Sequence, residues 1–204
     1  MPEDEPTVRP SSLRKRAAVL TAGRALFLGD GYERTSVDAV AARAGISKRT
    51  VYDYFGDKDG LFDAVIVDVG AEVVEAVRGA ADAELTAGRD IREALLAFAR
   101  RIAIDTVASS EHRLLRQLAN TERRTRRALA GFDDQPEALL AERFAELTRE
   151  GVLSTANPGR AAQHFVALTF MLALDVTRSA SGEDADIDAL LVDGVDAFLR
   201  AYHG

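Results

Sequence analysis

Cysteine and tryptophan are absent from this 204-residue sequence, and so is any long apolar run. Without cysteine the chain can form no disulfide and no thiolate metal site, and nothing in it indicates an oxidising compartment. Its longest apolar stretch, residues 165–176, is interrupted by Thr169 and Asp175 and is shorter than the ~20 residues of a membrane-spanning helix. The first ten residues are acidic and rich in proline, unlike the apolar core of a signal peptide. We therefore expect a cytoplasmic protein without a membrane partner, with a disordered tail over residues 1–10.

The familiar motifs of catalysis and cofactor binding are also missing. The sequence has no Gly-x-Gly-x-x-Gly, no P-loop, no Gly-x-Ser-x-Gly and no His-Glu-x-x-His string. Its three histidines are scattered at positions 112, 164 and 203. We therefore expect no enzyme, no cofactor and no metal site, and a helical enzyme is the least favoured interpretation.

The charge of the chain is distributed unevenly. The whole chain carries a net charge of −7, but residues 9–58 hold ten Lys and Arg against five Asp and Glu, which leaves this segment at +5 and the remainder at −12. A basic segment on an acidic body is typical of a protein whose basic part faces a polyanion. Chance clustering of charges is the alternative.

Helical periodicity runs through nearly the whole sequence, because apolar residues recur at spacings of three and four. No segment alternates apolar and polar residues over a strand's length, so the predicted fold class is all-α. We expect a three-helix domain over residues 11–56, followed by a larger helical domain over 57–204. The helices are predicted at about 12–28, 35–44, 48–54, 58–79, 90–108, 111–129, 136–150, 158–179 and 184–202.

The second and third predicted helices have the form of a helix-turn-helix. Ala41 and Ala44 are small enough for two short helices to cross closely, and Gly45 permits the tight turn between them. Ile46 and Val51 are predicted to fill the core beneath the turn. Thr35 to Asp38 fits a capping box, in which Asp38 would reach back to the start of the helix. The second helix would then present its N-terminal end to a DNA major groove.

Lys48 and Arg49 stand in the first turn of this second helix. Positive charge there opposes the helix dipole and costs roughly 0.3–1 kcal/mol per residue when exposed. Phosphates or guanine acceptors nearby would reverse that balance. The alternative is that two long exposed side chains simply tolerate a small penalty. Arg14 to Arg16 at the start of the first helix would reach an adjacent stretch of DNA backbone.

Residues 17–67 resemble the DNA-binding domain of the tetracycline-repressor (TetR) family. The matching residues are Ala25-Leu26-Phe27, Gly31-Tyr32, Thr35-Ser36-Val37, Val40-Ala41, Ala44-Gly45-Ile46-Ser47, Thr50-Val51-Tyr52, Tyr54-Phe55, Lys58-Asp59 and Leu61. The resemblance and the charge pattern together imply a set of DNA-binding residues: Thr35, Ser36, Arg43, Ser47, Lys48, Arg49, Thr50, Tyr52, Tyr54 and Lys58. Asp38 departs from relatives with a basic residue at its position, and Asp53 adds negative charge to the recognition helix.

The resemblance further implies a ligand cavity and a homodimer. Two apolar stripes, one from Phe165 to Val176 and one from Ile187 to Leu199, fit a bundle made by the last two helices of each subunit. The residues predicted to line the ligand site are Phe98, Ile102, Asp105, Phe144, Phe165 and Phe170. Core packing explains the phenylalanines equally well, and Asp105 fits either a partner for a cationic ligand or a solvent-facing carboxylate. For His112 and His164, positions in the core or at its rim are favoured over ligand contacts.

These observations favour a sequence-specific DNA-binding transcriptional regulator. In this interpretation it is a repressor that a small-molecule effector releases from a double-stranded DNA operator. The alternative is a helical adaptor whose helix-turn-helix packs against another protein and binds no DNA.

Overall fold

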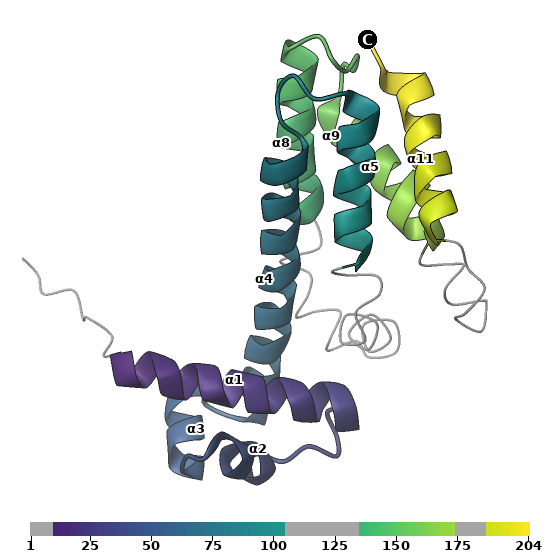
Figure 1. Ribbon diagram of the computed structural model, residues 1–204. Coiled ribbons are helices and arrows are strands. Elements are labelled where there is room, and N and C mark those ends of the chain that lie inside the picture. Colours follow the sequence, from purple (N-terminus) through teal and green to yellow (C-terminus); the bar gives the residue numbers. More distant parts are fainter. Residues whose placement is uncertain (1–9, 105–134, 174–186) are drawn as a thin grey trace, which may run out of the picture. The chain divides into compact units, whose positions relative to one another are not determined.

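The computed structural model describes residues 10–104, 135–173 and 187–204, and these residues are folded into helices without any strand. The prediction of an all-α fold is therefore confirmed. In chain order (Figure 1) the elements are α1 (Pro10–Asp30), α2 (Val37–Ala44), α3 (Lys48–Phe55), α4 (Lys58–Glu84), α5 (Ile91–Ile102), α8 (Gln135–Arg149), α9 (Pro158–Val166), the π-helical segment η2 (Ala167–Met171) and α11 (Ile187–Tyr202). Over the same residues, none of these helices is long and apolar enough to cross a bilayer.

The described residues form two compact units that divide at Gly70, inside α4. Unit 1 consists of α1, α2, α3 and the first half of α4, and unit 2 holds the remaining described helices. The chain stays in unit 1 beyond the predicted boundary at residue 57 because the first turns of α4 contribute Leu61, Phe62, Val65 and Ile66 to the core of unit 1. The domain boundaries of the chain as a whole remain a prediction.

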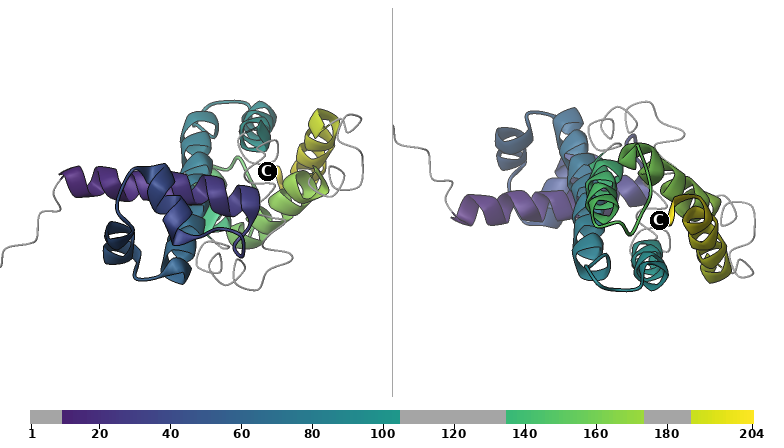
Figure 2. Two further views of the ribbon diagram at one scale, coloured as in Figure 1. Left: turned by 90° about the horizontal axis from the view of Figure 1, so that it is seen from below. Right: turned by 90° about the horizontal axis from the view of Figure 1, so that it is seen from above.

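Unit 1 is built around one apolar core under the helix-turn-helix. Val19 and Phe27 of α1, Val40 of α2 and Val51 of α3 are at most 1% exposed. The ring of Phe27 meets that of Phe62 edge-to-face, with centroids 5.1 Å apart. Figure 2 shows α1 beside α2, and the two are in contact. The predicted place of Val51 in the core beneath the turn is confirmed, and Ile46 packs against that core half-buried.

The helix ends in unit 1 follow local capping, with one correction. The side chain of Ser47 accepts from the Thr50 amide to begin α3, and Gly45, at a φ of 68°, ends α2 as predicted. However, α2 begins at Val37 rather than Thr35, because its N-cap is Ser36, whose hydroxyl accepts from the Ala39 amide at 3.1 Å. The predicted capping box of Thr35 and Asp38 is therefore wrong.

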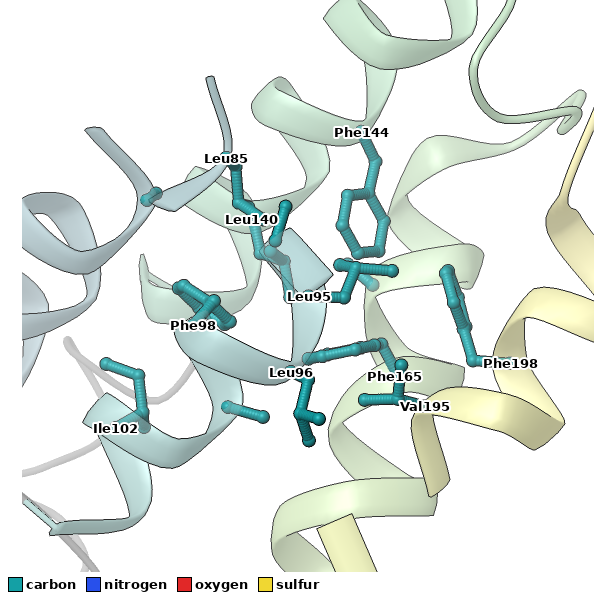
Figure 3. Close-up of a cluster of buried hydrophobic side chains, with 14 of the residues drawn as sticks. Leu85, Leu95, Leu96, Phe98, Ile102, Leu140, Phe144, Phe165, Val195 and Phe198 are labelled. Carbon is teal, nitrogen blue, oxygen red and sulfur yellow. The ribbon is translucent and has the colours of Figure 1, made fainter. Parts of the chain in front are cut away.

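Unit 2 is held together by the apolar cluster that Figure 3 shows between α5, α8, α9 and α11. Arg143 of α8 adds a hydrogen bond to this packing. Its Nε donates to the Leu85 carbonyl, just beyond the end of α4, at 2.6 Å. An unsatisfied carbonyl at a helix C-terminus is a favourable site for a cation. This contact helps α4 to extend to Glu84, five residues beyond the predicted end.

A π turn interrupts the helix that the sequence predicts over residues 158–179. Residues five apart on an α-helix point about 140° away from each other, and the wider turn of η2 reduces that angle. Phe165 and Phe170 are thereby brought together, with ring centroids 6.1 Å apart. The buried hydroxyl of Thr169 donates to the Phe165 carbonyl at 2.7 Å. Tertiary packing of the two rings thus outweighs the continuous α-helical pattern.

Two forked ion pairs join α5 to α11. Arg92 donates two hydrogen bonds to Asp196, at 2.6 and 3.1 Å, and Arg100 donates two to Asp188, at 2.6 and 2.8 Å. The paired residues lie eight positions apart on each helix, which fits antiparallel neighbours. Hydrogen bonds from the guanidinium groups lower the pKa of both Asp188 and Asp196 below the usual 3.8.

Replacing Asp196 with asparagine is expected to lower the melting temperature of the chain by a few degrees at pH 7. A carboxyl whose pKa is depressed in the folded state stabilises the fold above its unfolded pKa and loses that effect as the pH falls. The difference between the Asp196→Asn variant and the wild type should therefore begin to shrink as the pH falls towards 3.8, and it should vanish only below the depressed pKa of Asp196 in the folded state. Asp193→Asn, which removes an exposed carboxylate from the same helix, is the control. Equal melting temperatures for the two variants at pH 7 would contradict the prediction.

Candidate nucleic-acid interface

The recognition helix α3 is fixed to unit 1 along one side and is open to solvent along the others. Val51, 1% exposed, anchors it in the core, whereas Lys48, Arg49, Tyr52 and Asp53 are exposed. The Ser47 hydroxyl accepts from the Thr50 amide at 3.1 Å and lies 2.8 Å from the Thr50 hydroxyl. These hydrogen bonds order the end of the helix that would enter a groove.

Two arginines give this surface its unneutralised positive charge. Arg49 lies in the first turn of α3 and Arg43 in the last turn of α2, and both are exposed. Within the described part of the chain, neither forms an ion pair. An exposed guanidinium without a carboxylate partner can make forked hydrogen bonds to phosphate or to guanine.

Lys48, by contrast, has its partner on the protein. Its Nζ lies 2.9 Å from both carboxylate oxygens of Asp38, in the first turn of α2. The hydrogen bond and charge of Asp38 raise the pKa of Lys48 above its usual 10.5. The same Nζ is 6.0 Å from the centre of the Tyr52 ring. Asp38 therefore joins the two helices of the motif instead of capping its own.

Thr35 is not placed to contact DNA with its side chain, contrary to prediction. It is 3% exposed, and its hydroxyl donates to the Gly31 carbonyl at 2.9 Å. Its amide donates to the Tyr32 carbonyl at 3.3 Å. Ser36 is exposed at the N-terminus of α2, so that helix end keeps a surface donor.

The two tyrosines of α3 point to different surroundings, as their spacing predicts. Tyr52 is 41% exposed, and Tyr54 is half-buried with its hydroxyl 2.9 Å from that of Ser12 on α1. Arg16 of α1 lies over the Phe55 ring, 5.5 Å from its centre. These contacts hold the basic start of α1 against the end of α3. Ser12 was not predicted to take part, since a hydrogen bond across 42 residues has no local signal.

Lys58 lies at the start of α4, where it is half-buried. Its Nζ is 4.2 Å from the centre of the Tyr32 ring and 3.5 Å from the Glu33 carbonyl oxygen. The side chain of Asp57 caps α4, since it accepts from the Gly60 amide at 2.7 Å. Tyr32 was missed as a positioning residue for Lys58.

Of the predicted ligand-site residues, the four phenylalanines and Ile102 meet in the core of unit 2. The Phe165 ring lies 6.0 Å from that of Phe98 and 5.8 Å from that of Phe144. Phe170 lies 6.5 Å from Phe98. All but Phe170, which is half-buried, are 4% exposed or less. These residues, which were predicted to line a ligand site, therefore lie in the core of unit 2. Asp105, His112 and residues 111–129 lie outside the described residues.

This geometry defines a helix-turn-helix DNA-binding protein with a separate helical unit. Two family models match the chain: that of the bacterial regulatory proteins of the tetR family over residues 19–65, and that of the AefR-like transcriptional repressor C-terminal domain over residues 93–204. The chain belongs to the TetR family and is a DNA-binding transcriptional regulator. The predicted TetR family and the predicted role as a DNA-binding transcriptional regulator are thereby confirmed.

Individual relatives agree with this assignment. The chain is 25% identical to a TetR-family transcriptional regulator from Mesorhizobium loti MAFF303099, with a TM-score of 0.85 over 96% of this chain and 100% of that one. The flavonoid-responsive regulator FrrA is 28% identical, with a TM-score of 0.68 over 93% and 97% of the two chains. The uncharacterized HTH-type transcriptional regulator YhgD of Bacillus subtilis is 29% identical over 87 residues, 43% of this chain. The chain matches 46% of the length of that curated relative.

Proposed function

We propose that the protein is a dimeric repressor that a small apolar effector releases from its operator. The observation that carries the DNA-binding part is the exposed N-terminal end of α3, with Arg49 beside it and Arg43 at the end of α2, neither held by an acidic partner in the described residues. Repression is supported by the match of residues 93–204 to a transcriptional repressor domain. The proposed DNA contacts are Arg43, Arg49, Lys48, Ser36, Ser47, Thr50, Tyr52, Tyr54 and Lys58.

Dimerisation is supported by apolar side chains that unit 2 leaves exposed. Met171 and Leu172, at the end of the η2 segment, are 57% and 48% exposed. α11 packs against η2, so the two form one surface that a second copy would cover. A dimer would present two recognition helices ~34–36 Å apart, or a multiple of that distance, for a two-fold operator.

An aromatic effector is supported by the chemistry of the unit 2 interior. The core there is formed by Phe98, Phe144, Phe165, Phe170 and Phe198, whose rings meet mostly edge-to-face or tilted. A site opened among these rings would favour flat apolar molecules over charged ones. The relative FrrA is described as responsive to flavonoids, which belong to this chemical class.

Replacing both Arg43 and Arg49 with alanine is expected to weaken binding to promoter-region DNA by on the order of tenfold or more at about 0.1 M salt. Each lost phosphate contact should also make the plot of log affinity against log salt shallower by about 0.9, so the double variant should lose about 1.8. Fluorescence anisotropy across a salt series measures both quantities. Repeating the series with a flavonoid tests release by the effector.

The matched control is the double replacement of Arg78 and Arg149 with alanine. These two arginines are exposed in unit 2, so the net charge changes equally while the surface around α3 stays intact. The control variant should bind DNA like the wild type. Salt-independent binding, or no binding to any upstream DNA, would favour the adaptor interpretation and reject the proposal.

A further inference from the structure

The ion pair between Asp38 and Lys48 is unexpected on a surface that binds DNA. A carboxylate there repels phosphates, and it occupies the lysine that stands closest to the tip of the recognition helix. Lys48 is held on two sides, by both oxygens of Asp38 at 2.9 Å and by the Tyr52 ring at 6.0 Å. Arg49, the next residue, is exposed and has no ion-pair partner within the described ranges.

Stability of the fold is a weak explanation for this pair. Both side chains are half or more exposed, at 50% for Lys48 and 65% for Asp38, and ion pairs at such sites contribute little. The first turn of α2 does favour an acidic residue, but Ser36 already caps that helix. The remaining consequence of the pair is its effect on what Lys48 can bind.

We propose that Asp38 is a specificity-determining residue that keeps Lys48 from non-specific DNA, an inference that rests on the proposed DNA-binding function of α3. On random DNA no acceptor is positioned at Lys48 as closely as the two Asp38 oxygens, so Lys48 stays on Asp38 and adds no phosphate contact. At the correct site a better acceptor, such as O6 and N7 of guanine, draws Lys48 away. Asp38 thus discriminates by weakening the wrong complexes more than the right one.

The test compares four forms of the full-length chain on two DNA duplexes. The forms are wild type, Asp38→Asn, Lys48→Ala and the double variant Asp38→Asn/Lys48→Ala. The duplexes, each about 30 base pairs long, are one of random sequence and one that the wild type selects from a random library. Anisotropy titrations at about 50 to 200 mM KCl give the Kd and its salt dependence.

Asp38→Asn is expected to bind the random duplex about fivefold more tightly and with a salt slope steeper by about 0.9, because it frees one cation for phosphate. Binding to the selected duplex should tighten less, so the ratio of the two affinities should fall. In the Lys48→Ala background the Asp38→Asn change should lose most of its effect. Asp38→Glu, which can keep the ion pair, should behave like the wild type.

Asp53→Asn is the matched control, since it removes one exposed carboxylate from α3 itself. If it tightens binding to the random duplex as much as Asp38→Asn does, with the same slope, the effect is one of net charge and the inference is overturned. The inference is also overturned if Asp38→Asn leaves the ratio of affinities unchanged. In either outcome, salt-dependent DNA binding by the wild type would leave the proposed function intact. If the wild type showed no salt-dependent DNA binding, the proposed function would be rejected as well.

Discussion

Replacing Phe165 with alanine is expected to destabilise unit 2 by about 3–5 kcal/mol, the usual cost of deleting a fully buried ring. The Phe165 side chain is 0% exposed. Its ring centroid lies within 6.1 Å of the rings of Phe98, Phe144, Phe170 and Phe198. No neighbouring ring can fill the space without losing its own contacts, so the variant keeps a cavity. Urea unfolding followed by circular dichroism measures the loss.

Two control variants should lose less stability than Phe165→Ala. Phe165→Leu keeps part of the apolar volume and should cost clearly less than the alanine variant. Ile104→Ala removes an apolar side chain that is 70% exposed and should change the free energy of unfolding by less than about 0.5 kcal/mol. A Phe165→Ala variant as stable as Ile104→Ala would mean that the aromatic cluster does not support unit 2.

Replacing Gly194 with alanine is expected to destabilise the same unit by about 1–3 kcal/mol or more. A Cβ at this position would lie 2.2 Å from the carbonyl oxygen of Leu168 and 2.9 Å from its carbon. Backbone atoms cannot move aside as a flexible side chain can, so α11 would have to separate from η2. The experiment compares the unfolding midpoints of the variant and the wild type.

Gly79→Ala, on α4, is expected to change the stability in the opposite direction. Nothing lies within 4 Å of a Cβ built there, and the position is exposed inside α4, five residues before the helix ends at Glu84. Alanine is a better helix former than glycine by about 0.8–1.0 kcal/mol, so this variant should be more stable than the wild type. If Gly194→Ala lowers the free energy of unfolding and Gly79→Ala raises it, the close approach of α11 to η2 explains the difference. Equal effects of the two substitutions on stability would contradict that close approach.

The recognition motif shows how much local sequence can reveal. The sequence alone placed the turn at Gly45 and the recognition helix at about residues 48–54, and the caps Ser47, Gly45 and Gly56 each act within a few residues along the chain. The buried face of α3 follows equally from one apolar residue, Val51, among polar ones. The error at Asp38 has the same origin. Local spacing suggested a cap, while the carboxylate is held by Lys48, ten residues away.

At the predicted ligand site, local sequence was not enough to predict the structure. The sequence suggested Phe98, Phe144 and Phe165 as residues of one ligand site, but it gave no information on which helix faces meet. Their contacts depend on the packing of α5, α8 and α9, and the contact with Phe170 depends on the π turn of η2. No pattern in residues 165–170 distinguishes that turn from a continuous α-helix.

Local sequence was enough to predict that this protein is helical and where its recognition helix lies, because backbone capping and amphipathic spacing act over a few residues. Tertiary contacts were needed to show that Lys48 of that helix is paired with Asp38, that Thr35 is buried, and that α11 approaches η2 at Gly194. Those features arise where distant segments meet, and the competition between alternative partners for one charge or one surface is settled by packing.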